Sequence, residues 1–495
     1  MVNNIKKGWL SFSEIISRYF SPASIAVLVG FFVVSYILFY GQGHGYADNG
    51  DFARLINQNG LYQLHPQRAY TEYFQNQFGI KQYYVDGIMP IFSTSNWFIQ
   101  TALVLNRLFY SKIIFDIRFL GLVYLVFYLG AIYMFVRAIS GGERKVRHYI
   151  LGLVTVLIAC DSAITMYFNS FYTYPATFIL LLYAIALILL VPSLSDIKRY
   201  IAISAYFLVS ILLVLNNYAN APLAIVLFIG GIGFYFLPHV QYKGLYLGVG
   251  LLLIAVAGIA TTKLISPAEH NVNKYQSLSK GVLADDSNVN HKLISGEISQ
   301  QFTLMKDEDY YPVDYTTLRP DSKWVKNNLL DKYDIFWLTS YYGHSLSQFG
   351  ALLDDAAKNI MVVQNRSVGN YPKESHKPVG QVRYFTATSQ LTQTFYPKTY
   401  AFNFMLLIAL VIIYSVGMFR DFRSNRFNST LKYFLMMGLM IGVCVFPITS
   451  IMTFGKTNLA QHMLPVSFIL DMVLMIFLAD NVNHTLWGGG KEDED

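Results

Sequence analysis

The sequence predicts an all-α protein that crosses a membrane about ten times. Of its 495 residues, 54% are hydrophobic and 14% are charged, whereas soluble domains average about 25% charged residues. Apolar runs near the length of about 20 residues that a helix needs to cross the hydrocarbon core recur along the chain. This composition excludes a disordered chain and an ordinary cytosolic enzyme. The two cysteines, Cys160 and Cys444, exclude a disulfide scaffold and a cysteine zinc site.

Ten apolar runs carry this prediction. They cover residues 23–40, 119–138, 149–163, 175–192, 201–217, 222–237, 245–262, 399–418, 431–453 and 463–480. The third and the sixth run are short for a membrane span. The first follows three basic residues and shows no convincing small-residue cleavage site before Asp48. We therefore expect it to be an uncleaved signal anchor rather than a removed signal peptide.

The charges of the short loops predict the orientation in the cell membrane. Lysine and arginine fall on one side of the alternating spans, which the positive-inside rule assigns to the cytoplasm. These residues are Lys6, Lys7, Arg18, Arg137, Arg144, Lys145, Arg147, Lys198, Arg199, Lys243, Arg420, Arg423 and Arg426. The short outer loops 164–174 and 216–221 carry none. Segment 1–22 and the acidic tail 481–495 are therefore both expected in the cytoplasm.

Two outer segments are too long to be plain connections between spans. Segment 41–118 follows the first span, and segment 263–398 separates the membrane-spanning parts 23–262 and 399–480. Loops of this length are usually functional or form small domains. We expect interface helices in the first and a mostly helical loop domain in the second. The cytoplasmic loops hold no phosphate-binding glycine loop, so we expect the chemistry to face outward.

The most informative stretch is GHGYADNGDFARLINQNGLY, directly after the first span. Asp48 and Asp51 stand in a turn sequence before a short amphipathic helix that Gly60 should end. One interpretation is structural, with Asp51 capping the helix and Asp48 closing an Asx turn. Capping needs only one acid, so the second favours chemistry. The sequence 96–109, with Trp97 near its start, should form a helix along the membrane surface that walls a pocket for a lipid-linked substrate.

The order of these features resembles the C-type glycosyltransferases, which use polyprenyl-phosphate sugars. Within that group, DNGDF, NSFYTYP at 169–175 and GKTNLAQHMLP at 455–465 resemble bacterial cell-surface glycan hexose transferases. The resemblance implies a polytopic enzyme with an extracytoplasmic active site, a polyprenyl-phosphate sugar donor and a glycan acceptor. The last motif departs from the pattern, because Asn458 and Gln461 stand where a charge is expected.

Sugar transfer from a lipid phosphate needs a base, cations for the leaving phosphate, and polar or aromatic groups for the sugar. The resemblance implies one inverting displacement with an aspartate base, for which we expect Asp48 first and Asp51 second. Substrate binding is expected from residues of the outer segments and span ends, namely Arg54, Arg68, Asp161, Tyr172, His344, Arg366, Arg383 and His462. Each also has a structural interpretation, such as a solvated charge or a buried histidine. Tyrosine pairs at 83/84, 310/311 and 341/342 are further candidates for stacking on sugars.

No metal-ligand spacing such as HxxxH or HExxH occurs, so we expect no metal site and no cofactor. A divalent cation shared by Asp48 and Asp51 is an alternative that the sequence leaves open. The lipid bilayer is the expected surrounding, and no nucleic-acid partner is expected.

Two other functions stay open beside the enzyme, a hexosyltransferase. A transporter or flippase of lipid-linked glycans would need broken helices and charges buried at mid-membrane, of which the sequence shows few. A non-catalytic partner in glycan assembly would not need the acidic pair. The position of Asp48 and Asp51 at the outer mouth of the first span favours the enzyme.

Cysteine labelling in intact cells tests the topology. Cysteines introduced near Gly142 and Ser424 should be protected from a membrane-impermeant thiol reagent, because the positive-inside rule places both in the cytoplasm. A cysteine near Ser287, in the second outer segment, should react. Labelling near Ser424 from outside would contradict the ten-span topology and would place the acidic turn on the wrong side.

Overall fold

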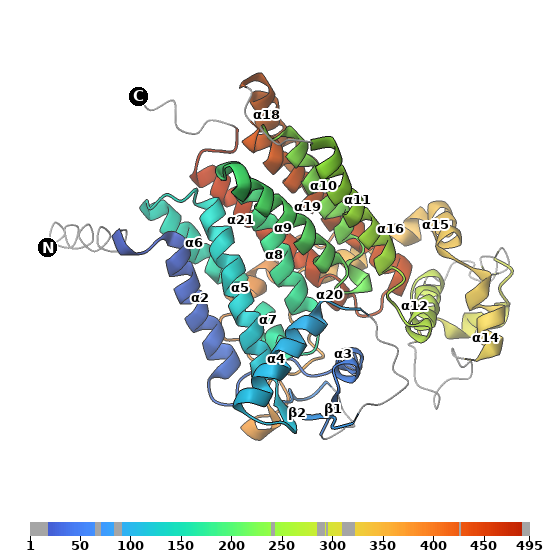
Figure 1. Cartoon of the computed structure of the whole chain (residues 1–495). Coiled ribbons are helices and arrows are strands. Elements are labelled where there is room, and N and C mark those ends of the chain that lie inside the picture. Colours follow the sequence, from blue (N-terminus) through green and yellow to red (C-terminus); the bar gives the residue numbers. More distant parts are fainter. Residues whose placement is uncertain are drawn as a thin grey trace.

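Long helices running side by side make up most of the molecule (Figure 1). The structure is a computed structural model, and it describes residues 18–64, 71–83, 92–238, 243–284, 293, 296–308, 322–424 and 427–487. In these ranges nine helical stretches are long and apolar enough to cross a membrane, and a bent pair of helices makes a tenth. The predicted all-α polytopic membrane fold is therefore confirmed.

The spans begin and end within a few residues of the predicted runs. They comprise α2 (Pro22–Phe39), α5 (Arg118–Ile139), α8 (Tyr174–Leu190), α9 (Asp196–Val214), α10 (Leu223–Ile232), α11 (Lys243–Thr261), α18 (Tyr400–Ser424), α19 (Asn428–Phe454) and α21 (Leu464–Val482). Short 3₁₀ turns extend α10 to a stretch of membrane length, Tyr218–Phe236. The sixth predicted run, which is short for a membrane span, is therefore a complete span whose ends are 3₁₀ turns.

The third predicted span is bent. Helix α6 (Val146–Ala159) is followed by α7 (Ser162–Thr165) and a 3₁₀ turn, and the two parts meet at 49°. The break falls at Asp161, whose side chain accepts a hydrogen bond of 2.9 Å from the Ala163 amide and so begins a new helix. An acid inside an apolar run thus ends one helix and caps the next.

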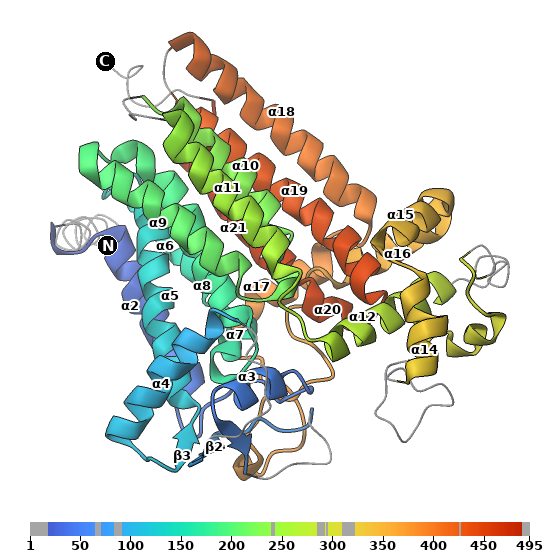
Figure 2. The same cartoon turned by 45° about the vertical axis from the view of Figure 1, so that its right-hand side comes forward.

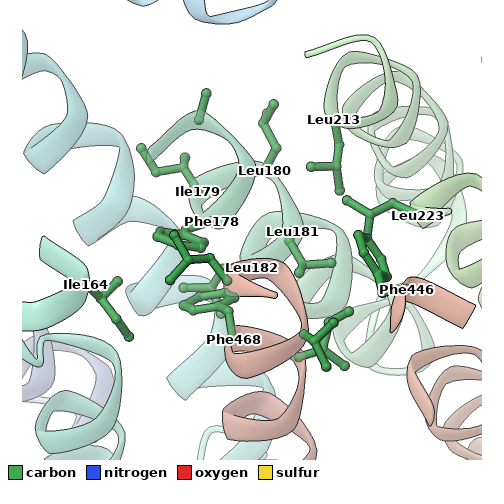
Figure 3. Close-up of a cluster of buried hydrophobic side chains, with 14 of the residues drawn as sticks. Ile164, Phe178, Ile179, Leu180, Leu181, Leu182, Leu213, Leu223, Phe446 and Phe468 are labelled. Carbon is green, nitrogen blue, oxygen red and sulfur yellow. The ribbon is translucent and has the colours of Figure 1, made fainter. Parts of the chain in front are cut away.

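The core of the bundle forms around α8. This helix is apolar on every side, which is typical of a helix buried on all faces, and it packs against α5, α9 and α21. Figure 3 shows side chains from α8, α9, α10, α19 and α21 meeting in one cluster. Phe178 and Phe468 stack there with ring centroids 4.9 Å apart. Close packing of this kind holds the outer ends of the helices in fixed positions.

The first outer segment folds against the end of the bundle. Helix α3 (Phe52–Gln58) and helix α4 (Ser95–Phe109) match the two predicted helices. Between and after them, β1 (Leu61–Gln63), β2 (Gln77–Ile80) and β3 (Ile114–Asp116) form an antiparallel sheet in that order. This sheet was not predicted, because strands of three or four residues are too short to show an alternating pattern.

The described part of the second outer segment is helical. It contains α12 (Pro267–Ser279), α14 (Lys323–Asn328), α15 (Ile335–His344), α16 (Leu346–Asn359) and α17 (Ala387–Phe395), with short 3₁₀ turns between them. Helices α14, α15 and α16 form a lobe at the side of the bundle (Figure 2). Residues 360–398 then return to the first outer segment, where the Gly369 carbonyl accepts from the Ala47 amide at 3.0 Å.

Asn169, the first residue of the NSFYTYP motif, ties the end of α2 to the first outer segment. Its buried Nδ2 donates to the carbonyls of Leu38 at 3.0 Å and His44 at 2.8 Å. The chain passes very close here, since a Cβ on Gly45 would lie 2.3 Å from the Asn169 carbonyl oxygen. Glycine is therefore required where the outer segment begins.

Replacing Asn169 with alanine should destabilise the protein. The change leaves the buried Leu38 carbonyl and the partly buried His44 carbonyl without this donor, and loss of a buried partner costs about 1–3 kcal/mol. The unfolding temperature of the purified protein in detergent measures the effect. Asn57→Ala, an exposed asparagine on α3, is the matched control and should be close to neutral. Equal unfolding temperatures for the two variants would show that Asn169 does not hold this junction.

Candidate functional site

Asp48 forms the centre of the acidic turn. Its Oδ1 accepts from the backbone amides of Gly50 at 2.7 Å and Phe52 at 3.2 Å, and its Oδ2 accepts from Gln63 Nε2 at 2.8 Å. The residue is 9% exposed. Burial raises the pKa of the Asp48 carboxyl above its usual range and the nearby Asp51 charge adds to this, while the three hydrogen bonds oppose it. The predicted Asx turn at Asp48 is confirmed.

The prediction that Asp51 caps α3 is wrong. The Asp51 side chain makes no capping hydrogen bond, because its backbone is already helical (φ −74°, ψ −18°), whereas a capping residue is extended. The first amide of the helix, that of Phe52, donates to Asp48 Oδ1. Asp51 Oδ2 instead accepts from Gln461 Nε2 at 2.6 Å. Gln461 Oε1 in turn accepts from Asn49 Nδ2 at 2.8 Å. The turn is thus linked to the GKTNLAQHMLP motif from the other end of the chain.

Solvent reaches the Asp51 side chain, but protein atoms packed around its carboxyl group replace part of the water there. This partial desolvation raises the pKa of the Asp51 carboxyl, and the Gln461 hydrogen bond and the Arg54 charge oppose the rise. Asp51 thus combines an accessible carboxylate with an environment that favours holding a proton. Both are properties expected of a residue that exchanges protons with a substrate.

Arg54 lies one turn along α3 and points to the second outer segment. Its guanidinium is 3.6 Å from the Glu269 carboxylate, donates to the Leu264 carbonyl at 3.1 Å, and lies over the Tyr218 ring at 5.6 Å. Its buried Nε has no hydrogen-bond partner among the described residues. Burial raises the pKa of Glu269, Arg54 lowers it, and the Asp51 charge raises it again. Two acids therefore lie near one guanidinium.

A small pocket opens beside Asp48. It has room for about one water molecule and is lined by Asp48, Phe52, Gln63, Tyr73, Gln75 and Phe78. Tyr172 lies beneath the turn, where its hydroxyl donates to the Ala47 carbonyl at 2.9 Å and its ring meets Phe52 edge-on at 4.9 Å. Tyr172 is 4% exposed, so it supports the turn from below.

His462 follows Gln461 and stacks on Phe454 with ring centroids 3.8 Å apart. Burial lowers the pKa of His462 to about 4. The imidazole is therefore neutral near pH 7 and supplies no positive charge to a phosphate. His462 is half-buried, and its stacking on Phe454 is a packing role.

The structure does not bring all predicted residues together. Asp161 lies at the bend after α6, and its carboxylate receives Thr388 Oγ1 at 2.6 Å and the Ser389 amide at 2.9 Å, both from α17. His344 ends α15 in the side lobe, away from α3 in both views (Figures 1 and 2). Its Nδ1 lies 2.7 Å from the Ser340 carbonyl. These two residues are thus engaged elsewhere.

The remaining candidate residues are exposed, buried or outside the described residues. Arg366 and Arg383 are exposed on the returning stretch 360–398, and Arg366 stands three residues before Gly369, which contacts the acidic turn. Arg68, Tyr84 and the pair 310/311 lie outside the described residues. Tyr341 and Tyr342 are buried, so the expectation that this pair stacks on sugars is wrong. Within the described ranges, no three His, Cys, Asp or Glu side chains come together as metal ligands.

The model of the YfdI N-terminal transmembrane domain matches residues 6–495. The chain belongs to this family. Together with the spans described above, the match shows a multi-pass membrane protein. Neither a curated protein nor a solved structure matches the chain significantly.

Two members of the site in this YfdI-family protein were missed in the sequence. Glu269 stands in the pattern SPAE, in which Ser266 Oγ accepts from the Glu269 amide at 3.1 Å and begins α12. That pattern predicts a helix start, but not the approach to Arg54 across 215 residues. Gln461 was noticed only as a missing charge. Its neutral amide is what lets it donate to Asp51 and accept from Asn49 at once.

Asp51→Asn should reduce the pH dependence of stability. A carboxyl whose pKa is higher in the folded than in the unfolded state adds stability at acid pH, and this contribution is lost as the pH rises from about 4 through the folded pKa. Over this window the unfolding temperature of the variant should therefore fall less than that of the unchanged protein. Glu72→Gln, at an exposed acid of the same segment, is the control. Identical slopes for Asp51→Asn and the unchanged protein would contradict the raised pKa.

Proposed function

We propose that this protein is a membrane glycosyltransferase that moves a hexose from a polyprenyl-phosphate donor to a cell-surface glycan acceptor at the outer face of the membrane. One observation carries the proposal. Two carboxyl groups with raised pKa lie on one turn beside a partly unpaired guanidinium, directly after the first span. The match to a transmembrane domain family supports the membrane setting of this chemistry.

Asp48 is our first candidate for the base. The acceptor hydroxyl would attack the anomeric carbon, the bond from that carbon to the phosphate oxygen would break, and the hydroxyl proton would pass to the carboxylate. One such displacement inverts the anomeric configuration. A raised pKa makes a carboxylate a better proton acceptor near neutral pH. Three donors fix the orientation of Asp48 while it lines the pocket.

Arg54 is our candidate for holding the donor phosphate, which leaves with the electron pair of the broken bond. Its buried Nε lacks a partner among the described residues, and hydrogen bonds between a guanidinium and a phosphate are charge-assisted and strong. Arg54 also lies against Leu264 and Tyr218, which are close to the outer ends of α11 and α10. A lipid tail in the membrane would bring its phosphate to this level. Asp51, beside Arg54, is the second candidate for the base.

The alternative function, a transporter or flippase of lipid-linked glycans, is favoured by the bent span α6–α7 with Asp161 at its break. Broken helices with charged residues are typical of transport sites. Donors from α17 and α7 surround the Asp161 carboxylate. This structural role accounts for Asp161 without a transport function. We therefore keep the enzyme as the leading proposal.

Asp48→Asn should bind the donor and barely transfer the sugar. Asparagine can still accept the Gly50 and Phe52 amides but cannot take the proton, and loss of a positioned base costs about 10²–10⁴ in rate. Transfer from synthetic polyprenyl-phosphate sugars by the purified protein measures this. An active Asp48→Asn beside an inactive Asp51→Asn would show that Asp51 is the base. Normal rates for both would overturn the enzyme proposal and favour the transporter.

Arg54→Ala should act mainly through donor affinity. Removal of the guanidinium takes away the positive charge nearest the acidic turn, so the KM for the donor should rise more than kcat falls. Arg54→Lys restores the charge but not a two-pronged contact, so partial rescue indicates that charge alone matters. Unchanged donor KM in Arg54→Ala would place the phosphate elsewhere.

A further inference from the structure

The first helix of the bent span is too short to cross the membrane. Helix α6 has 14 residues, which make about 21 Å at about 1.5 Å per residue, whereas the hydrocarbon core is about 30 Å thick. Basic residues stand at its start, at 144, 145 and 147, and place this end at the cytoplasmic side. The bend at Asp161 therefore lies within the membrane, below the outer ends of the neighbouring spans.

Contacts with α2 give the depth of the bend. Helix α2 has 18 residues, or about 27 Å, so its two ends mark the two faces of the hydrocarbon core. Gly30 lies nine residues, about 13.5 Å, before the outer end of α2 at Phe39. A Cβ on Gly30 would lie 3.1 Å from the sulfur atom of Cys160, the residue before Asp161. The bend is therefore close to the middle of the membrane.

Part of the second outer segment reaches the same depth. Thr388 and Ser389, at the start of α17, bind the Asp161 carboxylate, and Thr388 Oγ1 also lies 3.0 Å from the Leu157 carbonyl oxygen. Leu157 belongs to α6 and precedes the bend. In Figure 2, α17 lies beside the spans and apart from the lobe of α14, α15 and α16. The start of α17 is thus level with the interior of the membrane.

The chain arrives at this depth through a sharp turn. Phe385 has a left-handed backbone (φ 54°), which is rare for a bulky residue. Ser162 holds the turn, because its amide donates to the Phe385 carbonyl at 3.1 Å and its hydroxyl donates to the Tyr384 carbonyl. The Phe385 ring meets Tyr36, near the outer end of α2, edge-on at 6.1 Å. Since the next span begins at Tyr400, the chain returns to the outer face within 15 residues of this turn.

The polar groups of this stretch are satisfied within the protein, as the interior of a membrane requires. Every serine and threonine hydroxyl of α17 donates to an acceptor of the protein. The Asp161 carboxylate accepts from the Ser389 amide as well as from the Ala163 amide, so one acid caps both α17 and α7. Residues 384–397 contain no charged side chain, and Arg383 and Lys398 stand on either side of them. Basic side chains at both ends of an uncharged stretch are typical of a segment whose charges extend to the membrane surface.

One face of α17 is not covered by protein. Ala387, Leu391 and Phe395 recur at every fourth position and are all exposed, Leu391 to 58% and Phe395 to 77%. Residues four apart lie on the same face of a helix. The Leu157 side chain of α6 is exposed as well. The apolar face of α17 therefore continues the lipid-facing surface of α6.

We propose that residues 384–397 form a re-entrant segment that enters the leaflet on the side of the outer segments, and that the exposed face of α17 binds the acyl chains of lipids there. Asp161 makes this possible, because it satisfies the polar start of α17 at a depth without water. The second outer segment is then anchored in the bilayer by α17 in addition to its connection to α18. The stretch that braces the acidic turn lies directly before this anchor in the chain.

Spin labels on introduced cysteines, in the full chain in nanodiscs, test the proposal. Leu391→Cys and Val379→Cys are a matched pair, since the two side chains are 58% and 52% exposed in the same returning stretch, but Val379 lies outside residues 384–397. Molecular oxygen concentrates in the bilayer and a nickel chelate stays in water. We expect the ratio of oxygen to nickel collision rates to be severalfold higher at Leu391 than at Val379. The unchanged protein, in which Cys160 and Cys444 are buried, gives the background.

Acidic substitutions at the same two positions give a second readout. Leu391→Asp places a charge among acyl chains, which is costly, so the unfolding temperature in nanodiscs should fall well below that of the unchanged protein. Val379→Asp should leave it unchanged. Equal unfolding temperatures for the two acidic variants would overturn the proposal. Equal collision ratios at the two cysteines, or low access of both reagents at Leu391, would also overturn it, and the cysteine pair decides if Leu391→Asp does not fold.

Discussion

The Gln461 side chain joins the two ends of the chain at the acidic turn. It donates to Asp51 at 2.6 Å and accepts from Asn49 at 2.8 Å, across more than 400 residues of sequence. A glutamate in its place would repel Asp51, and a lysine could not accept from Asn49. The neutral amide is therefore the side chain that satisfies both partners. This contact ties the turn that precedes Arg54 to the short stretch before the last span.

The second outer segment braces the same region from the other side. Its returning stretch accepts the Ala47 amide at Gly369, donates from the Gly369 amide to Thr71 at 2.8 Å, and holds Tyr73 through Lys377. The same stretch continues into α17, which satisfies Asp161 at the bend of the third span. The bend and the pocket wall are thus held by one continuous piece of chain. The buried Asp161 carboxylate and the acidic turn are therefore held by the same segment.

The sequence predicts what depends on local pattern. Nine of the ten spans are predicted by uninterrupted apolar runs. Helix α3 is predicted because a turn sequence, an amphipathic pattern and a terminating glycine follow one another between Asp48 and Gly60. The bend at Asp161 lies inside one apolar run. From the sequence alone, an acid there is equally consistent with a helix cap inside a span and with the end of a span. That Asp48 accepts the Phe52 amide, while Asp51 binds Gln461 instead of capping the helix, depends on the folded geometry of the turn. Glu269, Gln461 and Tyr218 enter the site only through tertiary packing, so no local pattern identifies them.

In the proposed function, the charges around Arg54 determine how an anionic donor binds. Arg54 has one positive charge, while the Asp51 charge lies close enough to Glu269 to raise the pKa of the Glu269 carboxyl. With both acids ionised, two carboxylates face one guanidinium, and this excess of negative charge disfavours a further anion. Burial raises the pKa of both acids, so protonating one of them costs less than it would in water. A donor phosphate then replaces a carboxylate charge rather than adding to it.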